Sequence, residues 1–427
     1  MNLMKYKPLL FNPRFLLLWI GSFISGIGDA VAVVVIIWTL YNQTFSPLFI
    51  TLALICLELP SILLGPLWGV YVDRSPRTLV VLANIIRGCL FLYLLIVPLD
   101  SIANFSLFLG LLCISSSLAP ITKAGENMVV PKTVDKASLV TANSLMYIQF
   151  DLALVVGPLI GGILASQEYI QIAFIFNAIT FFISAIFFMY VFPKKQLVKG
   201  IENQKQKQKQ KLSQKFSSWN TEFREGLSYS FQNKSIASLM IISFLWNLLI
   251  WGTSPTLLPI FNKNQLMEGA TGYGMLGAAT SFGIVIGSLV IGALKVKHSL
   301  YELVMFSIIL HGIVYAFLFI VSDLWVAVML FSLSGIISAP AMIYMRTIVQ
   351  QHVPEEKLGR IFTVLSSFGA FGFPLGTTLA STFVMNFGEP LVSVAFLIFG
   401  GILSLTVIIL SIITRSNKKG MSNVQNF

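Results

Sequence analysis

Charged residues are scarce in this chain. Only 11% of its 427 residues are Asp, Glu, Lys or Arg, whereas a soluble domain carries about 25%. Hydrophobic residues make up 56% of the sequence, so water is not the main solvent for most of it. The net charge of +11 would suit a nucleic-acid partner in a soluble protein. Here the useful question is which side of a membrane the cations occupy.

Cysteine and histidine are also rare, with three of each. Cys56, Cys89 and Cys113 all lie within apolar runs, which excludes a disulfide framework, and their spacing matches no metal site. The sequence therefore predicts neither a metal centre nor a cofactor. The first apolar run, from Phe15, is long enough to span a membrane and lacks a small-residue cleavage site, so we expect no signal peptide.

Long apolar runs dominate the remainder of the chain. A helix needs about 20 apolar residues to cross the hydrocarbon core, and helices satisfy their backbone polar groups within lipid. The runs do not show the alternation of barrel strands. We predict an all-α integral membrane protein with twelve transmembrane helices. The expected spans are roughly 15–40, 48–71, 78–98, 104–130, 140–166, 170–192, 236–261, 271–294, 300–321, 325–349, 360–385 and 390–413.

The cations outside these spans predict an orientation. If the N-terminus lies inside, the inner loops and both tails hold nearly all of them, and the outer loops hold only Lys263. The positive-inside rule then places both termini in the cytoplasm.

A polar segment at 193–235 separates the first six spans from the last six. Its Lys-Gln run at 205–211 is typical of a solvated linker, with contact to anionic lipid as the alternative. Trp219, Phe223 and Leu227 recur at helical spacing, which favours a short amphipathic helix on the membrane surface. The predicted divisions are a six-helix bundle at 1–192, this linker, a second six-helix bundle at 236–413 and a cytoplasmic tail at 414–427.

The two halves show a weak internal repeat. Residues 134–139 resemble 353–358, and the Gly-Pro pattern at 157–161 resembles the pattern at 372–376. Matches in one order favour two pseudo-symmetric bundles, an arrangement that places a substrate path between the halves of a transporter.

The turn between spans two and three carries the most specific motif. It joins two apolar runs and holds one acid, Asp73, beside Arg74 and Arg77. The stretch 69–78 resembles the first-loop signature of the major facilitator superfamily. It matches that signature at Gly69, Asp73, Arg74 and Arg77, and departs from it at Tyr71, Pro76 and Thr78. The stretch 153–162 is similar to the signature of exporters in this superfamily, with Ala153 in place of its first glycine.

The resemblance covers nearly the whole chain and is greatest to bacterial efflux carriers of the macrolide-exporter and enterobactin-exporter type. It implies a secondary active transporter that exports amphipathic small molecules of drug, macrolide or siderophore type by alternating access, in exchange for protons. It also implies a monomer in the bacterial cytoplasmic membrane, with substrate, protons and lipids as partners and no nucleic acid. An importer or a lipid or nutrient carrier of the same fold is the alternative. An integral-membrane enzyme is remote, because the sequence shows no nucleophile–base pairing.

The resemblance further implies that the turn acts as a conformational latch. In the superfamily, the acid of this turn receives hydrogen bonds from a helix N-terminus across the two halves. We expect the partner of Asp73 near residues 359–360, at the start of span eleven.

Acids at mid-membrane depth are costly and are functional candidates. Asp29 lies midway along span one, on a face of small residues, and is predicted either to exchange protons or to make a structural hydrogen bond. Glu58 in span two is predicted either to relay protons or to pair with a cation such as Arg87. Asp151 in span five is a third candidate for the central cavity.

Other intramembrane charges favour structural or gating roles. Lys123 and Glu126 are three residues apart in span four and can pair along the helix. Arg346 in span ten has a comparable place in the second half. His311 in span nine is more typical of a satisfied buried histidine than of a proton carrier.

Two spans carry helix irregularities. In span five, Gly157 and Pro158 predict a kink, and Gly161 and Gly162 predict close helix packing. Span seven is interrupted by prolines, and broken helices often line substrate paths. Its Trp246, Asn247 and Trp251 are predicted to contact a bulky substrate, with an interfacial aromatic belt as the alternative.

Overall fold

The structure is a computed structural model, and it describes residues 9, 11–44, 46–72, 75–98, 101–135, 138–191, 228, 230–293, 299–353 and 355–424. All regular elements in these ranges are helices. Twelve helices within the described residues are long and apolar enough to cross a membrane. This confirms the predicted all-α transmembrane fold.

The chain divides into two compact units. Unit 1 comprises Met1–Gln206 with Glu268–Ser281, and unit 2 comprises Lys207–Met267 with Phe282–Phe427. The predicted amphipathic helix and the Lys-Gln run lie outside the described residues, so the predicted domain limits stay a prediction. At the C-terminal end, the last helix continues to Val424, past the predicted limit at 413.

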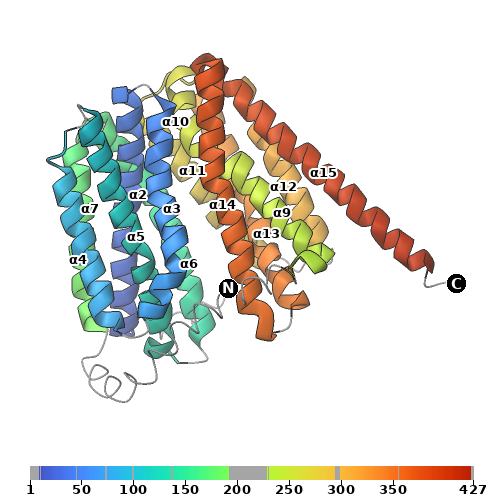
Figure 1. Cartoon of the computed structure of the whole chain (residues 1–427), viewed down its shortest axis with the longest axis horizontal. Helices are drawn as coiled ribbons and strands as arrows, with labels where there is room; N and C mark the ends of the chain where they lie inside the picture. The colour runs from blue at the N-terminus through green and yellow to red at the C-terminus, as the bar shows by residue number, and fades with distance from the viewer. Residues whose placement is uncertain are drawn as a thin grey trace. The chain divides into compact units, whose positions relative to one another are not determined.

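Unit 1 is built around its first long helix. Its helices are α2 (Pro13–Thr44), α3 (Pro47–Val72), α4 (Pro76–Leu94), α5 (Ile102–Thr133), α6 (Leu139–Ser166) and α7 (Ile170–Val191). Helix α2 packs against α6 and α7, α4 packs against α5 and α7, and α3 packs against α5 (Figure 1). Three of these helices begin at a proline, which suits a first turn because its N–H would have no partner there.

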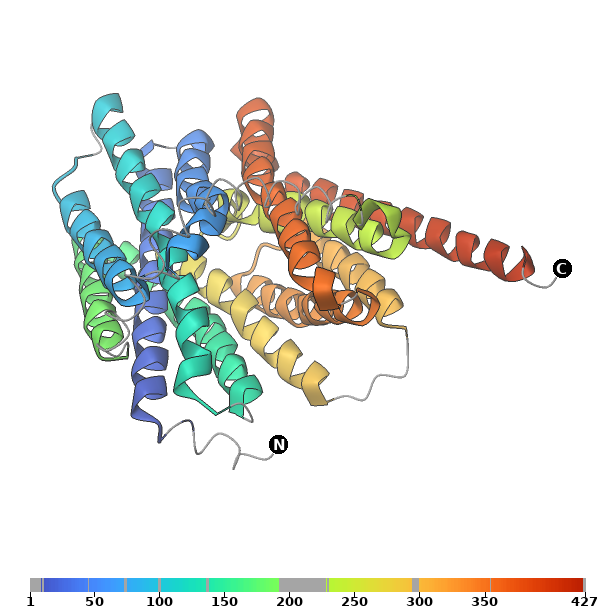
Figure 2. The same cartoon turned by 60° about the horizontal axis from the view of Figure 1, so that its bottom comes forward.

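Unit 2 contains the broken span. Its elements are α9 (Lys234–Trp246), the π-helix η4 (Asn247–Trp251), α10 (Ser254–Asn264), α11 (Ala270–Ala293), α12 (Leu300–Phe317), the 3₁₀ turn η5 (Leu318–Ile320), α13 (Leu324–His352), α14 (Glu355–Phe387), the 3₁₀ turn η6 (Glu389–Leu391) and α15 (Val392–Val424). Helix α12 packs between α13 and α15, and α14 covers α9 and η4 (Figures 1 and 2). The first half of α11 groups with unit 1.

Two apolar clusters fill unit 1 on either side of a polar layer. Along α2, Leu18 belongs to one cluster and Ala32 to the other, and Asp29 lies between them. Along α4, Val80 and Phe91 flank Arg87 in the same way. Asp29 and Arg87 are therefore held at one depth by apolar packing on either side.

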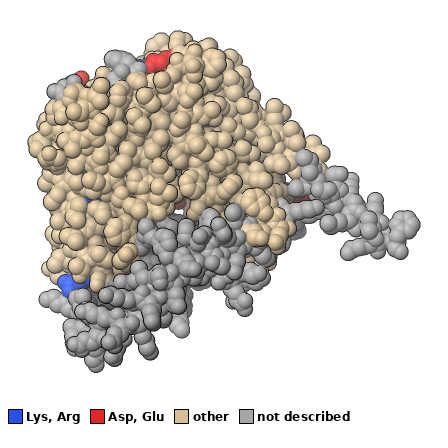
Figure 3. Space-filling view, viewed as in Figure 1, with Lys and Arg blue, Asp and Glu red and all other residues tan. Residues whose placement is uncertain are grey.

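The outer surface of the described helices is apolar. Among the described residues, uncharged ones cover almost all of the face shown in Figure 3. Large side chains such as Leu63, Ile163 and Leu405 are more than half exposed. A surface of this kind is unsuited to water and suits lipid.

Candidate functional site

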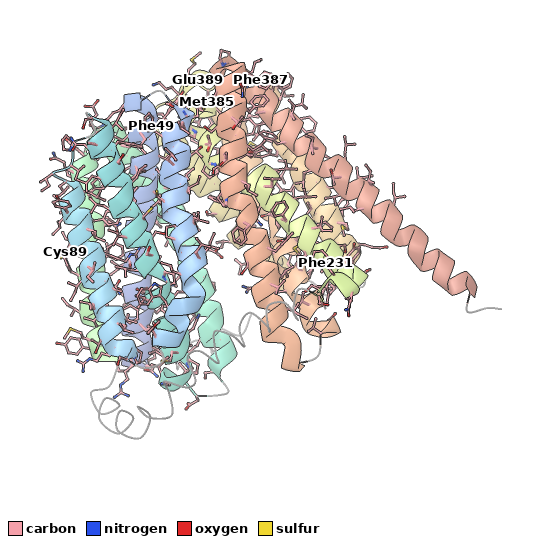
Figure 4. The ribbon with its side chains drawn as sticks, viewed as in Figure 1. Phe49, Cys89, Phe231, Met385, Phe387 and Glu389 are labelled. Atoms are coloured by element: carbon pink, nitrogen blue, oxygen red, sulfur yellow. The ribbon has the colours of Figure 1, made fainter. Side chains whose placement is uncertain are left out.

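An ion pair between α2 and α4 forms the centre of the polar layer in unit 1. One guanidinium nitrogen of Arg87, Nη2, lies 3.0 Å from Asp29 Oδ2 and 3.1 Å from Asp29 Oδ1. The Arg87 side chain is only 8% exposed, whereas that of Asp29 is 39% exposed. Cys89, two residues after Arg87, is exposed on the outer side of α4 (Figure 4), so Arg87 lies on the face turned into the unit. The Asp29 carboxylate therefore keeps accessible surface, whereas the Arg87 side chain is almost fully buried.

Uncharged groups from α5 and α7 support this pair. Arg87 Nε donates to Ser115 Oγ at 3.4 Å, and its guanidinium lies 4.1 Å from the centre of the Phe181 ring, a cation–π contact. Asn177 Nδ2 donates to Asp29 Oδ1 at 3.5 Å, and the Thr180 hydroxyl lies 3.2 Å from Asn177 Oδ1. Four helices therefore converge on one buried cation and its carboxylate.

Gly28 allows α7 to approach this pair. A Cβ atom added at Gly28 would lie 2.5 Å from Asn177 Oδ1 and would also collide with the Thr180 hydroxyl. A glycine is therefore needed beside Asp29 if Asn177 is to reach the carboxylate.

Glu58 lies at the same depth but does not pair with Arg87. Ser116, next to Ser115 on α5, donates to the backbone carbonyl of Leu57 at 2.5 Å, which aligns Glu58 with the polar layer. The Glu58 side chain is exposed and forms no ion pair with another described residue. The structure therefore does not contain the Glu58–Arg87 pair that was one of the two predictions for Glu58. Asp29 is the carboxylate that reaches Arg87.

Asp151 lies at a different depth from Asp29. Gly157 packs against Ala30 of α2, and Gly161 packs against Val34 four residues further along, so α2 and α6 run parallel and Asp29 lies beside residue 156. Asp151 is then about five residues, or roughly 8 Å, nearer the start of α6. It is half-buried and separate from the ion pair.

A second charged group links α5 to α2. Lys123 Nζ lies 3.2 Å from Glu126 Oε2, the contact within one helix that the spacing predicts. Ser22 of α2 donates to Glu126 Oε1 at 2.6 Å. The Glu126 side chain is 8% exposed and that of Lys123 is 57% exposed, so only the acid is sealed between helices. Arg346 is exposed on α13.

The glycines of α6 lie at close helix contacts. Gly161 packs against Val34 of α2, and a Cβ added at Gly162 would lie 3.0 Å from the Cα of Gly274 on α11. Pro158 lies inside α6, which is continuous from Leu139 to Ser166. These positions bring α2, α6 and α11 together within unit 1.

The break in span seven lies at the π-helix η4. Trp246 is 3% exposed, and its indole Nε1 donates to His311 Nδ1 at 3.0 Å. Trp251 and Asn247 are half-buried, and Asn247 Nδ2 donates to the carbonyl of Ser243. Of the three predicted substrate contacts, Trp246 is covered by protein, whereas Trp251 and Asn247 keep accessible surface.

The predicted latch lies largely outside the described residues. Asp73, Arg74 and the side chains of residues 359–360 are not described, and neither are the surroundings of Gly69 in α3. Arg77 is half-buried in the first turn of α4. The latch therefore stays a prediction.

Sequence reasoning did not identify the supporting residues Ser115, Asn177, Thr180 and Phe181. They carry no charge and lie within apolar runs. Asn177 could have been found, because an amide inside a membrane span needs a hydrogen-bond partner and so marks a helix contact.

The chain matches the model of the Major Facilitator Superfamily over residues 18–269 and 239–425. It is 26% identical over 401 residues to the provisionally named bacilysin exporter BacE of Bacillus amyloliquefaciens, covering 92% of this chain and 94% of that protein. It is 23% identical over 381 residues to macrolide efflux protein A of Streptococcus pyogenes, covering 88% of this chain and 90% of that protein.

The fold is also similar to a solved transporter structure. The nucleoside transporter NupG superposes with a TM-score of 0.72 at 17% sequence identity, covering 93% of this chain and 98% of that one. At this identity the likeness concerns the fold alone.

Proposed function

Because the chain belongs to the Major Facilitator Superfamily, we propose that it is a secondary active exporter of amphipathic small molecules that works by alternating access in exchange for protons. It is a multi-pass membrane transport protein rather than an enzyme, and transporters of this family bind small-molecule substrates. The direction of transport is supported by the efflux protein and the provisionally named exporter among its relatives. We place the substrate among drug, macrolide or siderophore types.

The Asp29–Arg87 pair is the observation that carries the proposed coupling. A carboxylate attracts a guanidinium only while it is ionised, so a proton on Asp29 would weaken the pair. Asp29 is 39% exposed and can be reached by water, whereas Arg87 is held by Ser115 and Phe181. Loading and release of a proton at Asp29 would then change the attraction between α2 and α4.

Other residues take subordinate parts in this proposal. Glu58, at the same depth, and Asp151 are further candidate proton carriers, and Trp251 and Asn247 are candidate substrate contacts. The Lys123–Glu126 pair and Arg346 are assigned to structure or gating. The turn that contains Asp73 is assigned to the latch.

The proposed setting follows from the charge pattern. We place the protein in a bacterial cytoplasmic membrane, with both termini and the 193–235 linker on the cytoplasmic side, because the cations gather there. It would act as a monomer of two six-helix bundles, 1–192 and 236–413, in contact with lipids and protons.

The proposal is tested by transport measurements in two systems. Cells with and without the gene are loaded with a panel of amphipathic compounds, and efflux is followed with and without a protonophore. Purified protein in vesicles is then tested with an imposed proton gradient of either sign. We expect gene-dependent export that the protonophore abolishes, and Asp29→Asn should uncouple it from the gradient. Uptake would favour an importer, and gradient-independent transport would overturn proton exchange.

A further inference from the structure

Helix α12 presents two polar side chains to the two ends of the break in span seven. His311 and Tyr315 are one turn apart and share a face of α12. His311 binds Trp246, the last residue before η4, and Tyr315 lies within hydrogen-bond distance of Thr253 and Ser254, which follow η4. The π-helical turn is therefore held from both ends by one helix.

The hydrogen bonds determine the protonation of His311. An indole N–H can only donate, so His311 Nδ1 must accept from Trp246 and carries no proton. The proton of the neutral ring then lies on Nε2, which is 2.6 Å from Ser334 Oγ on α13 and can donate to it. A second proton, on Nδ1, would break the bond to Trp246. The histidine is 1% exposed and Ser334 is 6% exposed, so neither group has water as a substitute partner.

The hydrogen bonds at the other end of the break also have defined donors and acceptors. Thr253 donates its hydroxyl proton to the carbonyl of Leu249 at 2.8 Å, so Tyr315 is the donor in its 2.9 Å contact with Thr253. Ser254 donates to the Tyr315 oxygen at 3.0 Å. Leu249 lies inside η4, where the wider turn changes the backbone pairing of an α-helix. Tyr315 thus supports a backbone carbonyl of the turn through Thr253.

The opposite side of the break is closed by α14. A Cβ atom added at Gly252 would lie 2.5 Å from the carbonyl oxygen of Phe373 and 2.9 Å from the Cα of Gly376. The turn is therefore packed between the backbone of α14 and the polar side chains of α12. Its shape is set by neighbours as well as by its own sequence.

We infer that His311 and Tyr315 are positioning residues that hold the π-helical turn and thereby orient Trp251 and Asn247. That Trp251 and Asn247 contact substrate rests on the proposed function. The clamp, meaning the hold of His311 and Tyr315 on the turn, does not. Arg87 in unit 1 carries a charge that can respond to Asp29, but His311 acts as a neutral ring with one fixed tautomer. Its role is to hold the turn in place rather than to carry protons.

Two substitutions of His311 separate its two hydrogen bonds. The Oδ1 atom of an asparagine can take the place of Nδ1 and accept from Trp246, whereas a glutamine reaches the place of Nε2 and keeps the Ser334 contact. If the bond to Trp246 holds the turn, His311→Asn should resemble the native protein and His311→Gln should not. Tyr315→Phe removes the support at the other end.

Hydrogen exchange by mass spectrometry measures the turn without any transport assay. For His311→Gln and Tyr315→Phe we expect backbone amides at 247–254 to exchange about tenfold faster, the loss of roughly one buried hydrogen bond. The matched control is Tyr301→Phe, which removes a 2.9 Å bond from α12 to Ser238 of α9 away from the break and should leave these amides unchanged. In transport, His311→Gln should raise KM with kcat changed less than about twofold.

The outcomes decide between the two roles. Faster exchange in His311→Gln with recovery in His311→Asn supports the clamp, even if no transported substrate has been found. Equal exchange in the native protein and both variants overturns it. If His311→Asn and His311→Gln both show native amide exchange but their transport no longer depends on the proton gradient, His311 would instead be identified as a proton carrier.

Discussion

Arg87 and His311 hold equivalent places in their units. Each lies on the third span of its half and binds a residue of the first span, Asp29 or Trp246. Each also contacts a serine of the fourth span, Ser115 or Ser334. The repeat has therefore kept the pattern of helix contacts, while one half uses a charged pair and the other a neutral one. Effects of proton binding should appear in unit 1.

Asp29→Asn should leave Arg87 without its ionised partner. Because Asp29 is 39% exposed, solvent screens the pair, and we expect the free energy of unfolding to fall by only about 1–2 kcal/mol. The double variant Asp29→Asn/Arg87→Gln should lose less than the sum of the single losses, since it leaves no unpaired charge. Thermal or denaturant unfolding in detergent measures the cycle. Strictly additive losses would mean that the two residues are not coupled.

Gly28→Ala should separate α7 from α2. The added methyl group would meet Asn177 and Thr180, and relief of that collision should cost about 1–3 kcal/mol of stability and weaken proton-coupled transport. Gly110→Ala on α5 is the matched control, because a Cβ there meets nothing within 4 Å. The control should be neutral or stabilise by up to about 1 kcal/mol through helix propensity. Equal effects at both positions would contradict the close approach.

Glu58→Gln should change transport without changing stability. Glu58 is exposed and forms no ion pair with another described residue, so the unfolding free energy should stay within about 0.5 kcal/mol of the native value. If Glu58 is a second proton carrier at the depth of Asp29, the ratio of protons to substrate in vesicles should fall. An unchanged ratio would leave Asp29 as the carrier at that depth. A large loss of stability would show that Glu58 has a structural partner.

The predicted orientation is open to a labelling test. In a variant in which Cys56, Cys89 and Cys113 are replaced by alanine, single cysteines are introduced at Lys263 and at Ser299. These positions lie on opposite sides of the membrane if α11, the helix between them, crosses it once. We expect a membrane-impermeant maleimide to label the cysteine at 263 in intact cells, and the one at 299 only after permeabilisation. The reverse pattern would invert the topology.

The broken span shows where prediction from sequence reached its limit. Prolines in span seven indicated an interruption, and the structure places a π-helical turn at Asn247–Trp251. The sequence could not show that Trp246 is covered while Trp251 stays accessible. That difference depends on α12 and α14, which are distant in the chain and meet the break only after folding.

The sequence by itself determined that the chain is an all-helical membrane protein with twelve spans. Length and hydropathy suffice for this, because lipid requires every backbone group to be paired within its own helix. It also marked Asp29, since a charge within an apolar run stands out. Which carboxylate pairs with Arg87 was decided only by tertiary structure, which brought Asp29 rather than Glu58 to the guanidinium. Asp29 and Glu58 lie at the same depth. Which of them meets Arg87 depends on how the helices are rotated and packed, and the sequence of a single helix does not determine that.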